Sequence, residues 1–193
     1  MLVHTLLPIL ILALTITTAA GCLGSRSVGW KPVELARDQR AVAAALPSGW
    51  FFFDDKAADP LILTRYGAHM DIVRVTQNGK LPFKLPYTEL PINAGMQPYE
   101  AAEAVVNNLL VTPGVFDLTM EELAPAEIDG ADAFRLSLSY SIENGMRRRA
   151  LIFGAIHGDH NYYTEMAMYA HEDYYFDAVI GDFLALVNGY KIK

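Results

Sequence analysis

The most metal-like group in the sequence is the run His157-Gly158-Asp159-His160. Imidazole and carboxylate side chains are ligands that zinc and copper accept in proteins. The two histidines flank a tight turn, however, and the spacing fixes no third ligand. Three further candidates lie on or at the end of other expected strands: His69, Asp71 and His171. We interpret the run as a hairpin turn with polar flanks and predict no metal site; a metal site at His157, Asp159 and His160 is the alternative.

Residues suited to catalysis are also poorly arranged in the sequence. There is no G-x-S-x-G nucleophile motif, no phosphate-binding loop and no dinucleotide fingerprint. The adjacent acids Asp54-Asp55 and Glu121-Glu122 would point to opposite faces of a strand. Three serines alternate along one expected strand: Ser137, Ser139 and Ser141. We therefore predict a protein without enzymatic activity and without a cofactor.

The single cysteine of the chain, Cys22, follows an apolar N-terminal stretch. Residues Leu6–Gly21 carry no charge, are fewer than the ~20 needed to span a bilayer, and end in small residues, which is typical of a cleaved export signal. The segment Ala19-Ala20-Gly21-Cys22 resembles the bacterial lipobox, in which the cysteine thiol is lipidated before cleavage. An ordinary cysteine behind an uncleaved signal-anchor is the alternative.

The lipobox resemblance implies a domain organisation and a location. Residues 1–21 would be a signal peptide and residues 22–33 a lipidated tether. Cys22 would carry a diacylglycerol, commonly with a third acyl chain on the new amine, because stable anchoring takes more than one chain. The chain would then face the periplasm from a membrane of the cell envelope. Leu23, in place of Asp, favours the outer membrane in Gram-negative bacteria.

Composition excludes several kinds of partner. Cleavage would leave 172 residues (193 minus 21), enough for one domain that buries ~70% of its unfolded surface. The formal net charge is -7, which argues against nucleic acid and against adhesion to anionic headgroups. The lipid, rather than a basic face, would therefore supply membrane attachment.

Hydrophobic periodicity predicts an α+β domain over residues 34–193. Residues 134–142 alternate strictly between apolar and polar, as half-buried antiparallel strands do, and Asn144-Gly145 predicts a hairpin turn after them. Helices are predicted at Glu34–Leu46, Pro98–Val111 and Asp177–Val187. Strands are predicted at Trp50–Phe53, Leu61–Tyr66, Met70–Thr76, Phe116–Leu123, Phe134–Ile142, Arg147–Ile156 and Tyr162–Ala170. The order α-βββ-α-ββββ-α indicates a single antiparallel sheet with packed helices.

This element order resembles the PsbP/Mog-type αβα sandwich of small bacterial lipoproteins, including the DcrB-like group. The resemblance covers most of residues 34–193. It rests on Pro47-Ser48-Gly49-Trp50 after the first helix, on Tyr99-Glu100-Ala101-Ala102-Glu103 in the second, and on the Phe183…Val187 pattern in the last. It implies an assembly or accessory factor that binds protein partners, and it brings no shared set of catalytic residues.

Three segments are candidates for partner binding. Lys80–Gln97 contains Pro82, Pro86 and Pro91, so it cannot be a continuous helix or a central strand. Its apolar side chains, Phe83 and Tyr87 among them, indicate either a binding element or a cover for an edge of the sheet. In the pair Tyr162-Tyr163, one ring would lie on each face of a strand. The two would be either a core ring and a rim ring, or they would include an exposed ring that contacts a partner. We interpret Arg147-Arg148-Arg149 as a solvated sheet margin, with docking of an anionic partner as the alternative.

Together these features predict a non-enzymatic envelope lipoprotein that binds another protein. The alternative is a lipoprotein that binds a small ligand or a metal through an aromatic pocket, and a third hypothesis is a hydrolase assembled only in the fold. A flat aromatic patch would favour the first hypothesis. A deep pocket in which His and carboxylate side chains converge would favour the other two.

Overall fold

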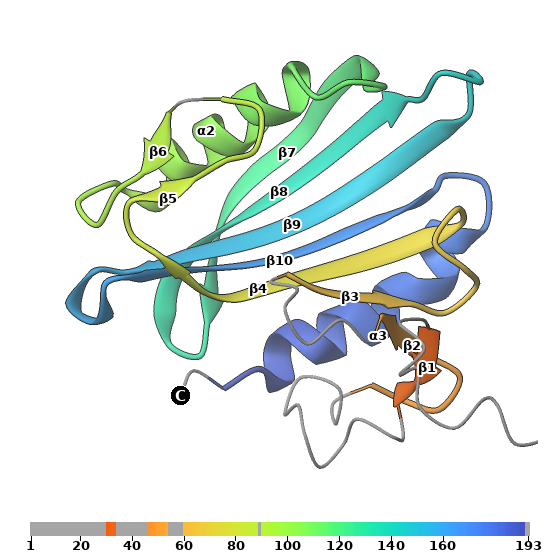
Figure 1. The fold of residues 1–193 in the computed structure, drawn as a ribbon, viewed down its shortest axis with the longest axis horizontal. Helices are drawn as coiled ribbons and strands as arrows, with labels where there is room; N and C mark the ends of the chain where they lie inside the picture. Colours follow the sequence, from red (N-terminus) through yellow and green to blue (C-terminus); the bar gives the residue numbers. More distant parts are fainter. Residues whose placement is uncertain (1–29, 34–45, 54–59, 89, 192–193) are drawn as a thin grey trace, which may run out of the picture.

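The computed structural model describes residues 30–33, 46–53, 60–88 and 90–191 (Figure 1). The expected signal peptide and Cys22 lie outside the described residues, as does the expected helix Glu34–Leu46 except for its last residue. No helix among the described residues is long and apolar enough to cross a membrane.

Ten strands, two α-helices and one 3-10 helix, η2 (Gly158–His160), make up the described fold. In chain order the strands and α-helices are β1 (Trp30–Pro32), β2 (Phe51–Phe53), β3 (Leu61–Thr64), β4 (Asp71–Lys80), β5 (Phe83–Lys84), β6 (Pro91–Ile92), α2 (Pro98–Leu110), β7 (Phe116–Ile128), β8 (Ala131–Ser141), β9 (Arg147–His157), β10 (Tyr162–His171) and α3 (Tyr175–Gly189).

Eight strands form one antiparallel sheet in the order β1-β2-β3-β4-β10-β9-β8-β7, and β5 and β6 form a separate small pair. The helix α2 covers one face of the sheet and α3 the other (Figure 1). The prediction of an α+β fold with a single antiparallel sheet and packed helices is confirmed.

Strict alternation along the central strands divides the core into two parts. On β10, Met166, Met168 and Ala170 pack toward α3, whereas Tyr163 and Ala167 pack toward α2. The α3 core is closed by fully buried helix residues such as Phe183, each of which contributes roughly 1.5–3 kcal/mol of burial free energy. Both faces of β10 are therefore mainly apolar, and Thr164 and Glu165 are its buried polar residues.

The helix α2 begins where the sequence indicates. Pro98 occupies its first turn, and the backbone N–H of Gln97 donates to the carboxylate of Glu100 at 2.7 Å. Its apolar stripe packs on β7, β8 and β9. The helix therefore packs mainly over the β7 end of the sheet rather than over β4 and β10.

Several boundaries differ from the predictions. β7 continues through Pro125 to Ile128, which is permitted because an edge strand needs no hydrogen bond on its outer side. β4 continues to Lys80. Trp30–Pro32, within the range expected as tether, pairs with β2. The short strands β5 and β6 give the proline-rich segment more regular structure than expected.

Candidate functional site

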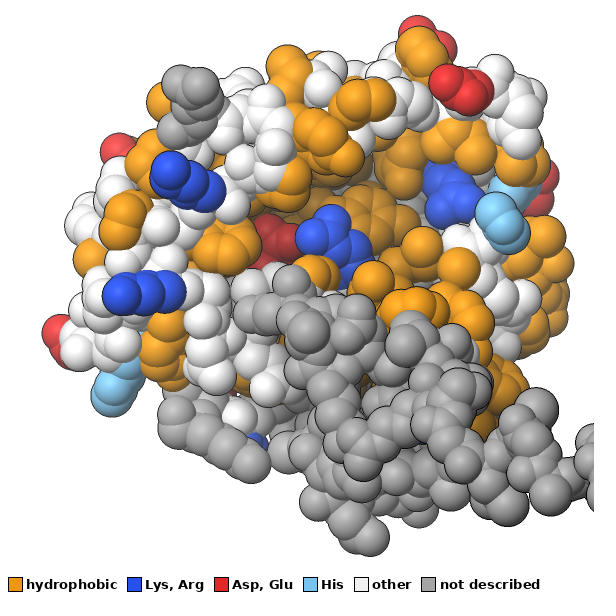
Figure 2. All heavy atoms as spheres, in the orientation of Figure 1, with side chains coloured by type: hydrophobic (Ala, Val, Ile, Leu, Met, Phe, Trp, Pro, Cys, Tyr) orange, Lys and Arg blue, Asp and Glu red, His pale blue; other side chains and the backbone are white. Residues whose placement is uncertain are grey.

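A cleft of about 500 Å³ opens on the α2 face of the sheet, beside the helix. Its floor consists of residues from β4, β8, β9 and β10, and its walls come from residues 83–87 and from α2. Figure 2 shows the hollow near the centre of the molecule, with basic and acidic side chains among hydrophobic ones. The floor carries these polar side chains: Arg74, Thr76, Tyr140, Arg148, Glu165 and Tyr169.

The proline-rich segment forms one wall of the cleft. The Phe83 ring packs on the Tyr163 ring, with centroids 5.2 Å apart. A Cβ on Gly79 would come within 2.6 Å of that ring, so glycine is needed for this approach. The backbone N–H of Tyr87 donates to the buried side-chain oxygen of Asn108 at 2.8 Å, which fixes the segment to α2.

These positions refine the sequence-based candidates. Phe83 and Tyr87 both line the cleft; Phe83 is half-buried, and 53% of Tyr87 is exposed. Tyr162 is half-buried beside His157. Tyr163 has no exposed surface, because Phe83 and the sheet enclose it, and it therefore offers no contact to a partner.

A buried carboxyl group lies in the floor of the cleft. Glu165 accepts a hydrogen bond from the Tyr163 hydroxyl at 2.9 Å. Burial raises the pKa of Glu165, while the charge of Arg74 and the Tyr163 hydrogen bond lower it in part. Burial also raises the pKa of the Tyr169 hydroxyl. Because a buried carboxyl group is costly unless it has a partner or a function, Glu165 and the neighbouring Arg74 are candidates for a binding role.

Arg148 occupies the same face as these residues, opposite Tyr140 in the strand register. Its Nη2 donates to the backbone oxygen of His69, and its Nε is buried without a hydrogen-bond partner. It forms no ion pair among the described residues.

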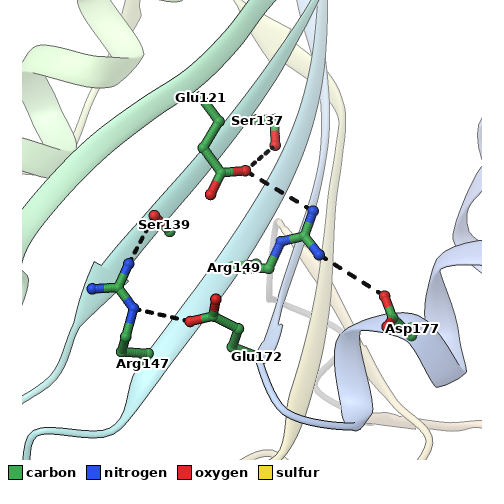
Figure 3. Close-up of polar contacts among 7 residues, drawn as sticks. All are labelled: Glu121, Ser137, Ser139, Arg147, Arg149, Glu172 and Asp177. Carbon is green, nitrogen blue, oxygen red and sulfur yellow. Dashed lines mark hydrogen bonds and ion pairs between the residues drawn. The ribbon is translucent and has the colours of Figure 1, made fainter.

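The neighbouring arginines point to the opposite face of the sheet (Figure 3). Arg147 pairs with Glu172 at 2.9 Å and donates to Ser139 Oγ at 3.0 Å. Arg149 lies 3.9 Å from both Glu121 and Asp177. The run of three arginines therefore divides into two residues with carboxylate partners and one cleft residue.

The metal candidates do not converge in the described structure. His157 is buried against the Tyr162 ring, with centroids 4.5 Å apart, and its Nε2 has no hydrogen-bond partner. Burial and the neighbouring His160 lower the pKa of His157. His160 stacks more loosely on the same tyrosine at 5.9 Å. Nowhere in the described part of the chain do three His, Cys, Asp or Glu side chains gather in a way that could hold a metal ion.

Asp71 has a different task, because it organises the turn between β3 and β4. Its carboxylate accepts the backbone N–H groups of Arg65 and Tyr66, each at 2.7 Å, and the Thr64 hydroxyl at 3.2 Å. Burial raises the pKa of Asp71 despite these hydrogen bonds. His171 Nδ1 lies 3.9 Å from a carboxylate oxygen of the exposed Asp173.

A second surface, which we call the α2–β7 surface, gathers exposed apolar side chains along the helix and the edge strand. Its members are Tyr99, Leu110, Val111, Met120 and Leu123, each at least 37% exposed. A groove of about 580 Å³ runs between Tyr99 at the start of the helix and Leu123 to Ala126 of β7. Because the groove walls are almost entirely apolar, this surface suits a macromolecular contact better than a catalytic one.

Comparison with known proteins supports the fold. The sheet of this chain, with a helix on each face, has the PsbP-type architecture. The structure is similar to the solution structure of cyanobacterial PsbP (CyanoP) from Synechocystis sp. PCC 6803, with a TM-score of 0.53 and 14% identity. That similarity covers 90% of this chain and 100% of the other, and at this identity it establishes the fold alone.

A weaker similarity is to LpqN of Mycobacterium tuberculosis, which is involved in cell envelope biogenesis. The TM-score is 0.39 at 15% identity, covering 85% of this chain and 78% of that one. No protein-family model matches the chain, and no curated protein sequence matches it.

The sequence-based reasoning missed the charged floor of the cleft. Arg74 alternates with the buried Val73 and Val75, which in a sequence is typical of a solvent-facing residue. Glu165 gives the better signal, because it is a single acid inside an otherwise uncharged strand between Tyr162 and Ala170. A charge is costly to bury among apolar residues without polar partners, so its presence in such a strand is a signal for a polar site.

Proposed function

We propose that this chain is a non-enzymatic, lipid-anchored protein of the cell envelope that binds a partner protein as an accessory or assembly factor. The observation that carries the proposal is the α2–β7 surface. Exposed apolar patches rimmed by polar residues mark interaction sites in soluble domains. The lipid on Cys22 would hold the domain at the membrane with this surface free to meet its partner.

The charge of this surface indicates the chemistry of the partner. The helix α2 carries two acids and no Lys or Arg, and β7 carries four acids and no Lys or Arg. Glu121 and Glu122 are paired with arginines on the α3 side of the sheet. Glu103, Asp117 and Glu127 form no ion pair within the described residues. The partner segment that fits is therefore apolar with flanking Lys or Arg.

The lipid anchor has a direct test. We expect Cys22→Ser to abolish acylation, because the thiol is the acceptor of the lipid in the lipobox that residues 19–22 resemble. Metabolic labelling of cells with a fatty-acid probe measures this, with wild type beside the variant. Equal labelling of both proteins would contradict lipidation at Cys22.

Charge reversal tests the α2–β7 surface. The double variant Glu103→Lys/Glu127→Lys raises the formal net charge from -7 to -3. Both side chains are exposed, so we expect stability to change by at most ~0.5 kcal/mol per site. In capture from detergent-solubilised membranes, quantified by mass spectrometry, we expect the partner's yield to fall at least about tenfold, because like charges now face its basic residues.

The matched control is Asp159→Lys/Asp173→Lys, which makes the same change of charge at exposed sites away from α2 and β7. We expect this control to capture the partner as wild type does. Equal loss in both variants would mean that net charge, rather than this surface, governs capture. If the wild-type chain captures no protein that an unrelated lipoprotein used as bait does not also capture, the protein-binding function itself is contradicted.

A further inference from the structure

We propose that the cleft is a second binding site, separate from the α2–β7 surface, for a small organic anion with an apolar body, and that Arg148 holds its anionic group. This ligand would occupy the space between β4, β10 and residues 83–87. The proposal does not depend on protein binding, since the two sites use different residues.

The charge inside the cleft is opposite to that of the whole chain. Three cationic side chains line it, Arg74, Lys84 and Arg148, and one carboxylate, Glu165. Three positive charges and one negative charge give a net lining charge of +2, whereas the chain has -7. A concave site with apolar walls concentrates such a field and attracts anions.

Arg148 is the cleft arginine that has no carboxylate partner among the described residues, and the exposed Lys84 is a second cation open to a ligand. Of the six described arginines, four form ion pairs with carboxylates, and Arg74 lies beside Glu165. Arg148 forms no ion pair with a carboxylate; it donates a hydrogen bond to the backbone oxygen of His69, and its charge and hydrogen bond partly offset the rise that burial causes in the pKa of Tyr140. A guanidinium has five N–H donors in a planar fork that matches a carboxylate or a phosphate. The remaining donors of Arg148 therefore have no anionic partner in the described part of the chain.

The walls define the rest of the ligand. Ile72, Phe83, Leu85, Val105 and Leu109 line the cleft, so most of the surface around the charged floor is apolar. Its volume of about 500 Å³ lies within the range of roughly 300–1,000 Å³ that holds drug-sized molecules. A bare inorganic anion would leave these walls in contact with water. The best fit is an aromatic or aliphatic carboxylate or phosphate.

The test uses 2-naphthoate as the probe, titrated calorimetrically against the full chain in lipid nanodiscs. We expect saturable binding, at least about tenfold weaker for the uncharged 2-naphthamide, because a charge-assisted hydrogen bond is lost. Comparison with 2-naphthyl phosphate distinguishes a carboxylate from a phosphate preference. Equal affinity for 2-naphthoate and 2-naphthamide, or no binding of 2-naphthoate beyond that to empty nanodiscs, would overturn the proposal.

Two variants test whether Arg148 binds the anionic group of the probe. We expect Arg148→Gln to weaken 2-naphthoate binding at least about tenfold and to leave 2-naphthamide binding unchanged. The matched control is Arg149→Gln, the next residue, whose side chain lies on the opposite face. Unchanged binding in Arg148→Gln would overturn the assignment. If that variant does not fold, Leu109→Trp fills the cleft from α2 instead, and binding that survives it would place the probe elsewhere.

Discussion

Replacing Trp50 by alanine lowers the free energy of unfolding by about 4 kcal/mol, the largest loss that we expect from one side chain. Trp50 is fully buried in the α3 core. Its Nε1 donates to Asp182 Oδ2 at 2.9 Å, and Arg65 donates to the same oxygen at 2.6 Å. The substitution therefore opens a cavity and also removes a contact between α3 and the residue that precedes β2.

Urea denaturation followed by circular dichroism measures this loss. Trp50→Phe should cost less than the alanine variant, because the ring still fills most of the space while the hydrogen bond is lost. The control is Trp30→Ala, which changes the other tryptophan of the chain, 41% exposed on the edge strand β1, and which should cost under ~1 kcal/mol. Similar losses at Trp30 and Trp50 would contradict the placement of Trp50 in the core.

The position of Trp50 shows why the fold could be predicted from the sequence. Pro47-Ser48-Gly49-Trp50 is part of the pattern that resembles the PsbP type, and its tryptophan joins the sheet to the last helix. The alternation in residues 134–142 suffices to predict a strand with one apolar face. Such features are local, and so they predict elements and their order without any knowledge of neighbours.

The cleft could not be predicted from the sequence, because the residues of its floor come from four different strands. Arg148 differs from Arg147 and Arg149 only in the face to which it points, and a sequence cannot show which face is hollow. That depends on where α2 ends and on how residues 83–87 fold back, both of which are tertiary facts. The cleft differs from the pocket of the alternative hypothesis, because arginine, tyrosine and glutamate side chains line it and no histidine does.

The proline-rich segment combines both interpretations that its sequence left open. Phe83 covers the sheet over Tyr163, as a cap on the core would. Tyr87 and Leu90 are more than half exposed, as a contact element would be. Pro82 and Pro86 lie in bends and Pro91 begins β6, and the hydrogen bond to Asn108 fixes the position of the segment. One segment thus carries a structural residue and exposed residues only a few positions apart.

Phe83→Ala and Tyr87→Ala should separate these two roles. We expect Phe83→Ala to cost about 2 kcal/mol, less than a fully buried phenylalanine, because the half-buried ring leaves a gap over Gly79 and Tyr163. Tyr87→Ala should cost at most ~0.5 kcal/mol, since its anchoring hydrogen bond uses the backbone N–H, which alanine keeps. It should nevertheless weaken 2-naphthoate binding by about threefold, because the lost ring lines the cleft.

Urea denaturation and calorimetric titration of each variant give both quantities. Leu90→Ala is the matched control, since Leu90 is exposed in the same segment and does not line the cleft; it should alter neither stability nor binding. Strong destabilisation by both Phe83→Ala and Tyr87→Ala would show that the whole segment is a structural cover. Unchanged 2-naphthoate affinity in Tyr87→Ala would remove this residue from the binding site, because an exposed ring that adds nothing to affinity does not contact the ligand.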